Sequence, residues 1–169
     1  RRIDDWIQWI PNGALWSPQN IDRVFSRGLE TEFSYHIQVK KWNFDLIVKT
    51  AYTLATREAT TLLNDPTLHK QLIYIPKYSD CFIFTVSRSE TCLRALVSYN
   101  GYRFTSADQL SYLDPFTSTS VQLMQTMTIS KRKTTVHIDC DNFFNTNYQL
   151  VENKPQPLRN FRFGLSIFI

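Results

Sequence analysis

Two groups of acidic and histidine side chains have a spacing that could support chemistry in a β-strand. His137, Asp139 and Asp141 alternate along one stretch, so a strand would place all three on one face, within reach of one metal ion. Glu30 and Glu32 have the same spacing, and paired carboxylates can divide general acid and general base work. A strand lined with polar side chains that face water shows the same spacing without any chemistry, and we favour that interpretation for both groups.

Other reactive residues lack the arrangement that catalysis or metal binding needs. Cys81, Cys92 and Cys140 show no CxxC spacing and no histidine motif, which argues against zinc and thiol redox chemistry. A Cys81–Cys92 disulfide stays open, although the expected turn does not place the two residues opposite each other. No Gly-x-Ser-x-Gly elbow occurs. We therefore expect no enzyme, no metal and no cofactor, with a membrane-barrel lipase as the enzymatic alternative.

Length, charge and hydropathy narrow the class of protein. A chain of 169 residues is long enough for one domain with a sizeable core. The net charge of +4 is scattered or confined to short clusters, so it does not form the basic face of a nucleic-acid-binding protein. No apolar run approaches the roughly 20 residues of a membrane helix, and the first residues lack the apolar centre of a signal peptide. Any passage across a membrane must therefore use strands.

Alternating apolar and polar residues predict eight strands that would position these side chains. The expected strands cover residues 2–10, 23–38, 42–57, 72–87, 91–105, 115–129, 134–144 and 161–169. Many are much longer than the roughly five or six residues of ordinary globular strands. Residues 55–63 are the one candidate helix, but their β-branched threonines favour a strand end followed by a loop.

The connections between the expected strands alternate in length. Short turns at 39–41, 88–90 and 130–133 alternate with long polar loops, so one end of the sheet is trimmed and the other is elaborate. This asymmetry, with aromatic residues near strand ends, is typical of transmembrane β-barrels. The aromatic residues are Trp6, Trp9, Trp42, Phe44, Tyr99, Tyr102 and Phe104. A soluble β-sandwich or calycin-like barrel would show the same alternation with its apolar face inward, but the loops and aromatics favour lipid.

Two sets of motifs resemble those of TonB-dependent outer-membrane receptors. Residues 142–148 (NFFNTNY) and 159–167 (RNFRFGLSI) resemble the C-terminal signature of that family. Residues 5–11, 16–20, 26–30 and 71–77 resemble segments of the cobalamin-receptor type found in Bacteroidetes. The chain departs from the family pattern at Pro157-Leu158, where Pro-Gly is usual, and at its last residue, Ile169, where an aromatic residue is expected.

The resemblance implies an all-β, antiparallel, up-and-down transmembrane β-barrel. Residues 1–169 would form its C-terminal segment, about eight of 22 strands, while the plug domain and the TonB box would lie outside this chain. The implied function is TonB-dependent transport of a scarce nutrient, such as a corrinoid or a siderophore, across the bacterial outer membrane. The implied partners are outer-membrane lipid, the rest of the receptor in the same or a separate chain, TonB through the plug, and the barrel insertion machinery. The alternative is a standalone eight-stranded barrel with a binding or structural role.

The resemblance also assigns roles to three sets of residues. Ligand-binding positions on extracellular loops would be Trp16, Asn20, Tyr112, Asn147 and Tyr148, for which girdle or loop packing is the alternative role. Polar residues that line the barrel lumen would be Glu30, Glu32, Asp45, Lys49, Arg94, His137, Asp139 and Asp141. The C-terminal insertion signal would be Phe161, Phe163, Leu165, Ile167 and Ile169, which share the apolar face of the last strand.

Overall fold

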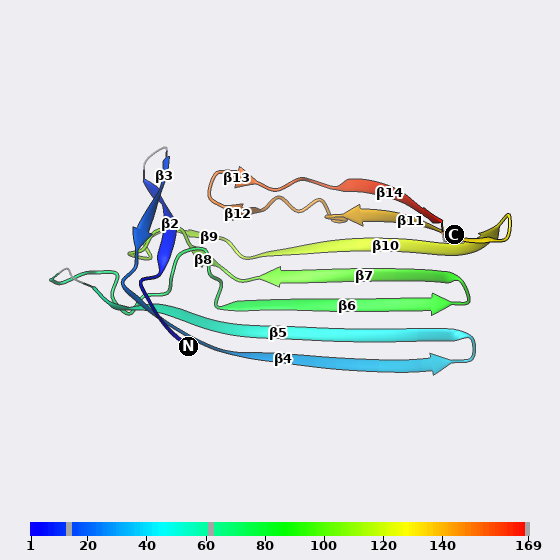
Figure 1. The fold of residues 1–169 in the computed structure, drawn as a ribbon, viewed down its shortest axis with the longest axis horizontal. Coiled ribbons are helices and arrows are strands. Elements are labelled where there is room, and N and C mark those ends of the chain that lie inside the picture. Colours follow the sequence, from blue (N-terminus) through cyan, green and yellow to red (C-terminus); the bar gives the residue numbers. More distant parts are fainter. Residues whose placement is uncertain (13–14, 61–62, 168–169) are drawn as a thin grey trace.

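Eight strands form one long antiparallel sheet in the order β1-β4-β5-β6-β7-β10-β11-β14 (Figure 1). The computed structural model describes residues 1–12, 15–60 and 63–167. The strands of the sheet are β1 (Arg2–Asp4), β4 (Arg23–Val39), β5 (Trp42–Ala59), β6 (Tyr78–Arg88), β7 (Thr91–Asn100), β10 (Phe116–Ile129), β11 (Arg132–Asp141) and β14 (Asn160–Ile167). The predicted all-β, antiparallel fold is therefore confirmed. No helix in the described ranges is long and apolar enough to span a membrane.

Three small strand pairs gather at one end of this sheet (Figure 1). They are β2 (Ile7–Asn12) with β3 (Leu15–Asn20), β8 (Arg103–Phe104) with β9 (Tyr112–Leu113), and β12 (Gln149–Val151) with β13 (Lys154–Pro155). The long connections belong to this end, which we call the loop end. The opposite end carries three two-residue turns and is called the turn end. The predicted alternation of short and long connections is therefore confirmed.

The turns at the turn end reverse the chain without glycine. Lys40, Ser89 and Ser130 each open a two-residue turn with a positive φ of 55°, 51° and 51°, and Lys131 follows at 64°. Tight hairpins need this left-handed backbone because it matches the twist of the two strands. A residue with a side chain adopts it at a steric cost. The pairing of long strands on either side must offset that cost.

The first and fourth predicted strands were wrong in extent. The chain leaves the sheet after Asp4, because Asp5 has a positive φ of 55° and β2 then pairs with β3 as a separate hairpin. The fourth strand begins at Tyr78 and not at residue 72. The preceding residues Leu72 and Ile73 are 6% and 3% exposed, so burial at the loop end removes them from the sheet.

The fifth and seventh predicted strands also changed in extent. The seventh, expected at residues 134–144, is β11 and ends at Asp141. The fifth predicted strand ends at Asn100, where the Gly101 amide donates to the carbonyl of Tyr78 and the chain turns away. Residues 55–59 continue β5, as predicted against a helix.

All three cysteines are free, and the register sets Cys81 opposite Ser98 and Cys92 opposite Ser87. The disulfide that the sequence left open does not form.

The sheet is open at both edges. Strands β1 and β14 lie at opposite ends of the strand order, and no pairing joins them within the described ranges. The closed, standalone eight-stranded barrel is therefore not the structure that this chain forms. Strand β4 has a neighbour on its outer side only near its start, where Arg23–Phe25 pair with β1. Most of its length presents unpaired backbone groups, which are a template for another strand.

Buried apolar side chains gather at the loop end and not under the sheet. Ile21, Val24, Ala55 and Leu72 form a buried cluster, and Ile75 packs against it. These residues come from the connection into β4, the start of β4, the end of β5 and the segment before β6. Within the described ranges the long middle of the sheet has no such cluster on either face, so its two faces are available to different surroundings.

Candidate functional site at the polar face and the loop end

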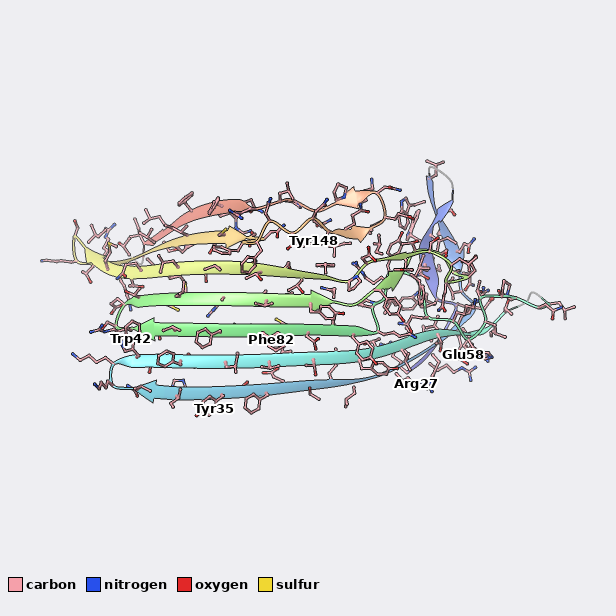
Figure 2. The ribbon with its side chains drawn as sticks, turned by 180° about the vertical axis from the view of Figure 1, so that it is seen from behind. Arg27, Tyr35, Trp42, Glu58, Phe82 and Tyr148 are labelled. Atoms are coloured by element: carbon pink, nitrogen blue, oxygen red, sulfur yellow. The ribbon has the colours of Figure 1, made fainter. Side chains whose placement is uncertain are left out.

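The register divides the sheet into two faces of opposite character. Phe33, Val48, Phe82 and Val97 are in register across β4, β5, β6 and β7, and the residues that alternate with them on those strands point the other way. Aromatic and aliphatic residues dominate their side, which we call the apolar face. Its side chains Tyr35, Trp42 and Phe82 come from three neighbouring strands (Figure 2).

Nothing in the described structure covers the apolar face. Phe163 is 76% exposed, Leu29 66% and Phe33 58%. Soluble monomers rarely expose contiguous apolar patches of more than a few hundred Å². Asp80 and a hydrogen-bonded pair, Thr31 and Thr50, with 2.6 Å between hydroxyl oxygens, also lie on this side near the loop end. The apolar face therefore needs an apolar environment over most of its area. Its polar residues lie near its two margins, since Thr91 and Gln125 form a second pair on this side at the turn end.

The apolar face forms a band that slants across the strands. On this side the last arginine before the band is Arg27 on β4, with Leu29 two residues later. The corresponding arginine at β14 is Arg159, with Phe161 two residues later. Phe161 is nevertheless level with Tyr35 and not with Leu29. The register runs from Phe161 to Tyr35 through Cys140, Val121, Ala95, Phe84 and Leu46. The margin of the band therefore shifts by six residues toward the turn end between β4 and β14.

This shift measures the tilt of the strands against the band. Six residues correspond to about 20 Å along a strand, and six inter-strand gaps correspond to about 29 Å across the sheet. The band therefore makes an angle of about 35° with the direction across the strands, from those same spacings. Membrane-spanning barrel strands tilt by about 35–45° from the membrane normal. The sheet thus carries the geometry of tilted spanning strands in its residue pattern.

Aromatic side chains mark both margins of the band on β5 and β6. Tyr52 and Tyr78 are in register near the loop end, with ring centroids 4.9 Å apart. Trp42 lies at the turn end, where the Arg88 guanidinium sits 5.2 Å from its ring centroid. From Trp42 to Tyr52 is about 33 Å along the strand, or about 27 Å across a band tilted by 35°, close to the roughly 25 Å apolar belt of membrane barrels.

Of the aromatic residues predicted for the girdles, only some lie on the sheet. Trp42, Phe44 and Tyr99 are on the apolar face. Trp9 belongs to the β2–β3 hairpin, Trp6 precedes it, and Tyr102 and Phe104 belong to the loop end, where their rings meet edge to face at 5.3 Å. For those four residues the girdle prediction was wrong, because their segments leave the sheet.

All eight residues predicted to line a lumen lie on the opposite face, called the polar face. They are Glu30, Glu32, Asp45, Lys49, Arg94, His137, Asp139 and Asp141. Several are paired across neighbouring strands. The Lys49 ammonium lies 3.0 Å from a Glu32 carboxylate oxygen, and His36 Nδ1 lies 2.6 Å from Asp45 Oδ1. Glu32 is thus one half of an exposed ion pair, which is the arrangement of a hydrated polar wall.

The aspartates of β11 are held by an arginine from β14. Arg162 lies 3.0 Å from Asp141 Oδ2 and 3.8 Å from Asp139 Oδ2, while His137 Nε2 is 3.8 Å from Asp139 Oδ2. The His137 ring occupies the space above Gly164, where an added Cβ would lie 2.1 Å from Cε1. No group of three metal-ligating side chains comes together anywhere in the described ranges. The i, i+2, i+4 spacing therefore serves a cross-strand polar network.

Two grooves open on the polar face. One, of about 380 Å³, lies beside Glu30, Glu32 and Lys49, and the other, of about 510 Å³, lies beside His36 and Arg94. Both grooves are bordered by charged side chains of the polar face.

At the loop end a buried arginine lies against a pair of stacked aromatic rings. Phe116 and Tyr148 stack with ring centroids 4.1 Å apart, and the Arg103 guanidinium lies 5.0 Å from the Phe116 centroid. Arg103 is 3% exposed, and its Nη2 donates to the Asp114 carbonyl at 3.2 Å. Burial lowers the pKa of the Arg103 guanidinium. Asn147 and Tyr148 line a neighbouring hollow of about 230 Å³.

The structure does not bring the five predicted ligand-binding residues to one place. Asn147 and Tyr148 share the hollow beside Phe116, whereas Tyr112 lines a different one. Trp16 lies on the β2–β3 hairpin with its ring centroid 5.9 Å from that of Tyr74. The fifth residue, Asn20, supports the local backbone, because its Oδ1 accepts the Asp22 amide at 2.8 Å.

Sequence reasoning missed the salt bridges that anchor the loop after β5. Arg57 lies 3.0 Å from Asp22 Oδ2 and 2.9 Å from Asp65 Oδ2, which ties that loop to the start of β4. Hydrogen bonds from the Thr67 hydroxyl and amide and from Thr60, together with the Arg57 charge, lower the pKa of Asp65 to about 2. No motif signals this group, because its members meet only when the loop folds back.

Four of the five residues of the predicted insertion signal lie along the apolar face of β14. Phe161, Phe163, Leu165 and Ile167 pair with Cys140, Ile138, Val136 and Thr134 of β11. The fifth, Ile169, lies outside the described residues.

Comparison with known proteins identifies the fold but no close relative. No protein-family model matches the chain, and no curated protein sequence does. The structure is similar to that of BauA, the ferric preacinetobactin receptor from Acinetobacter baumannii, with a TM-score of 0.71 at 13% sequence identity. The match covers 96% of this chain and 25% of the receptor chain. The fold is similar to that of a TonB-dependent receptor barrel fragment, and the chain spans about a quarter of that receptor's length.

Proposed function

We propose that this chain forms part of the β-barrel wall of a TonB-dependent receptor in the bacterial outer membrane. In this proposal residues 1–169 are a C-terminal barrel segment, and the plug domain and the TonB box belong to the remainder of the receptor, in the same or a separate chain. The unpaired outer edge of β4 supports this role, because it offers the backbone groups that a neighbouring barrel strand would use. The likeness of almost the whole chain to a quarter of a receptor also supports it.

The slanted apolar band is the observation that carries the proposal. It has the tilt of spanning strands, about 35°, and nearly the height of a bilayer core, about 27 Å. In the proposed barrel, lipid would contact the face that carries this band. A sheet that packed on a protein core would not need an apolar margin that moves by six residues from Leu29 to Phe161.

In this receptor the polar face would line the lumen and the loop end would lie outside the cell. The cross-strand pairs of Glu32 with Lys49 and of Arg162 with Asp141 suit a hydrated wall. Asn147 and Tyr148, beside the hollow of about 230 Å³, are the ligand-binding candidates that the geometry supports best. The apolar residues of β14 would present the insertion signal to the barrel assembly machinery.

The proposed activity is import of a scarce nutrient chelate, energised by TonB through the plug. The solved neighbour is a receptor for a ferric siderophore, which supports transport and not catalysis. A corrinoid as cargo, and the cobalamin-receptor type, are supported by the sequence motifs at residues 5–11, 16–20, 26–30 and 71–77. A siderophore is the other chelate that the proposal includes.

Uptake by cells that carry the full-length receptor tests this activity. Cells would be grown with a cobalamin or a ferric siderophore as the sole source of cobalamin or iron, with and without the gene that contains this chain, and with and without TonB. We expect growth on one of these chelates to require both genes. Growth that is unchanged by removal of the receptor gene on every chelate would refute the proposed transport.

The position in the membrane is tested separately by single cysteines in a cysteine-free receptor. Phe33, Phe84 and Leu165 on the apolar face would be compared with Ser34, Thr85 and Ser166 beside them on the polar face. We expect a water-soluble maleimide to label the second set and a spin label on the first set to report contact with lipid. Equal labelling of both sets in water would contradict the lipid-facing band.

A further inference from the structure

The turn end concentrates positive charge. Its three turns and their flanking residues, 38–43, 87–92 and 129–134, lie along one end of the sheet (Figure 1). Six of the 19 lysines and arginines of the chain are in these residues, but only one of its 15 acidic residues, Glu90. The six cations are Lys40, Lys41, Arg88, Lys131, Arg132 and Lys133, and all six are exposed. The turn end therefore carries more positive charge than the whole chain, whose net charge is +4.

The cations form two clusters of the same composition. The register pairs Arg88 with Trp42, the residue that follows the Lys40-Lys41 turn, so one arginine and two lysines lie together. This group is called the first basic cluster. The second basic cluster is the β10–β11 turn, where Arg132 stands between two lysines. None of these cations forms an ion pair within the described ranges, so each cluster presents three charges that no carboxylate neutralises.

Both arginines stand on the apolar face, at the margin of the band. Arg88 is on the same side of β6 as Phe84, and its guanidinium lies 5.2 Å from the ring centroid of Trp42. Arg132 pairs with Ile129 on the same face of the sheet. The stem of an arginine covers apolar surface while its charged head stays in water. The two guanidinium groups are therefore placed where the band ends and the headgroups of a bilayer would begin.

The slant of the band places the two arginines at nearly the same depth. The register carries the level of Arg88 across β7 and β10 to Val136, and Arg132 lies four residues beyond Val136 toward the turn end. The shift of six residues over six inter-strand steps predicts three residues for the three steps from β6 to β11. The remaining residue corresponds to about 3 Å along the strand. The two strands end at different levels of the sheet, yet their arginines reach one height of the tilted band.

We infer that the two basic clusters bind the phosphate groups of an acidic phospholipid in the leaflet at the turn end. The guanidinium of each cluster binds phosphate oxygens at the margin of the band, because its fork matches a phosphate in a bidentate manner. The two lysines beside it add the charge that favours an acidic lipid over a zwitterionic one. This inference rests on the proposed function, in which lipid contacts the apolar face.

The placement of the charges favours lipid over a soluble anion. Arg88 and Arg132 lie on the face that lipid would contact, and Arg88 shares the margin of the band with Trp42. By strand spacing and rise, their Cα atoms are about 20 Å apart. One compact anion does not span that separation, whereas a layer of headgroups at a single depth supplies a phosphate to each cluster.

Photo-labelling by lipids tests the inference on the full-length receptor in vesicles. Phosphatidylcholine vesicles would contain a trace of photoactivatable phosphatidylglycerol or the same amount of photoactivatable phosphatidylcholine, and mass spectrometry would locate the labelled residues. We expect phosphatidylglycerol to label residues 39–43, 87–90 and 129–133 about fivefold more than phosphatidylcholine, or better, because each nearby cation attracts an acidic lipid by about that factor. High salt should weaken this preference by screening.

Neutral variants of one cluster provide an internal comparison. Lys40→Gln, Lys41→Gln and Arg88→Gln together should lower the preference at residues 39–43 and 87–90 to about twofold or less, while the second basic cluster keeps its preference. The matched control is Arg94→Gln, which removes an exposed cation from the polar face and should change the labelling at neither cluster. If the triple variant fails to insert, glutamine at all three positions of the second basic cluster replaces it, and the comparison of the two lipids on the unmodified receptor decides without any variant.

Three outcomes would overturn the inference. The first is equal labelling of the turn end by the two lipids. The second is loss of the preference when inorganic phosphate is added at constant ionic strength, which would assign the clusters to free phosphate. The third is loss of the preference when soluble peptidoglycan fragments are added, which would assign them to an acidic cell-wall polymer.

The proposed function has a separate readout in the cysteine labelling of Phe33, Phe84 and Leu165. Lipid contact at these positions without a preference for the acidic lipid at the turn end would overturn the headgroup sites and leave the barrel intact. Water contact at these positions would instead contradict the lipid-facing band, and with it the proposed function.

Discussion

The sheet and the loop end differ in what stabilises them. At the loop end Val24, Ala55 and Leu72 bury one another, and Arg57 and Asp65 close the loop above them. Along the sheet neither face has a buried cluster in the described ranges, and Phe163 leaves 76% of its surface open. The loop end thus brings its own core, whereas the sheet depends on what surrounds it. Substitutions at the loop end should therefore change the stability of its own core. Substitutions on the sheet should change its stability through contacts with the surroundings.

The largest effect is expected where a charge enters the apolar face. Phe84 stands near the middle of the band on β6, so Phe84→Arg should destabilise the membrane-inserted barrel by about 4 kcal/mol, the cost of arginine near the bilayer midplane. Urea unfolding of the full-length receptor in lipid vesicles measures this. The control is Thr85→Arg, at the next residue in the chain, whose side chain is on the polar face. It should cost about 1 kcal/mol at most. Similar losses for both variants would remove the distinction between the faces.

A cavity at the loop end should have the next largest effect. Leu72 is 6% exposed within the buried cluster, so Leu72→Ala should cost about 2–3 kcal/mol of local stability. Hydrogen exchange of the amides around residues 21–24 and 71–75 should accelerate, while the exchange of β6 and β7 should stay the same. Leu63→Ala, at a side chain that is 94% exposed, is the control with little change. Acceleration that spreads along β6 would show that the two regions are not independent.

The loop anchor should respond to pH at the acid end only. The pKa of Asp65 in the folded protein is about 2, below its ordinary value of 3.8. The stability that this carboxylate contributes is therefore fully present above pH 3.8 and is lost as the pH falls through 2. Protease protection of residues 58–77 should persist at pH 4.5 and decline below pH 3.5, and Asp65→Asn should remove this pH dependence. A loop that loosens between pH 6 and 5 would contradict the assignment to Asp65.

The smallest effect is expected on the polar face. Glu32 and Lys49 are exposed and 3.0 Å apart, and such pairs contribute about 0.2–1 kcal/mol. Glu32→Gln should therefore change the urea midpoint of the receptor very little, and by less at high salt than at low salt. Lys49→Gln and the double variant complete a cycle that isolates the pair. A loss above about 2 kcal/mol would indicate a buried partner on this face and not a hydrated wall.

Several features could be predicted from the sequence because they depend on near neighbours in the chain. The alternation in Phe161, Phe163, Leu165 and Ile167 assigns these side chains to one face of a strand wherever that strand lies. The same local rule assigned Glu30 and its seven companions to one face. Short turns such as Lys40-Lys41 could also be predicted. The alternating apolar and polar residues of the two neighbouring strands leave no room for a longer connection.

Other features were decided only by contacts between distant segments. Leu72 and Ile73 continue the pattern of a strand, but burial against Val24 and Ala55 takes them out of the sheet. Nothing near Arg103 in the chain shows that it will lie over Phe116, which itself stacks on Tyr148. The register that aligns Ile47 with Ile83 and Leu96 is likewise a property of three strands together.

The sequence by itself therefore determined which side chains share a face, because each short stretch shows the two-residue period of a strand. The tertiary structure decided that the sheet stays open and that its apolar margin slants from Leu29 to Phe161. It also decided that Ile47, Ile83 and Leu96 lie side by side on the polar face. These properties depend on hydrogen-bonded register across as many as seven strands. Register joins residues far apart in the chain, and no local pattern contains that alignment.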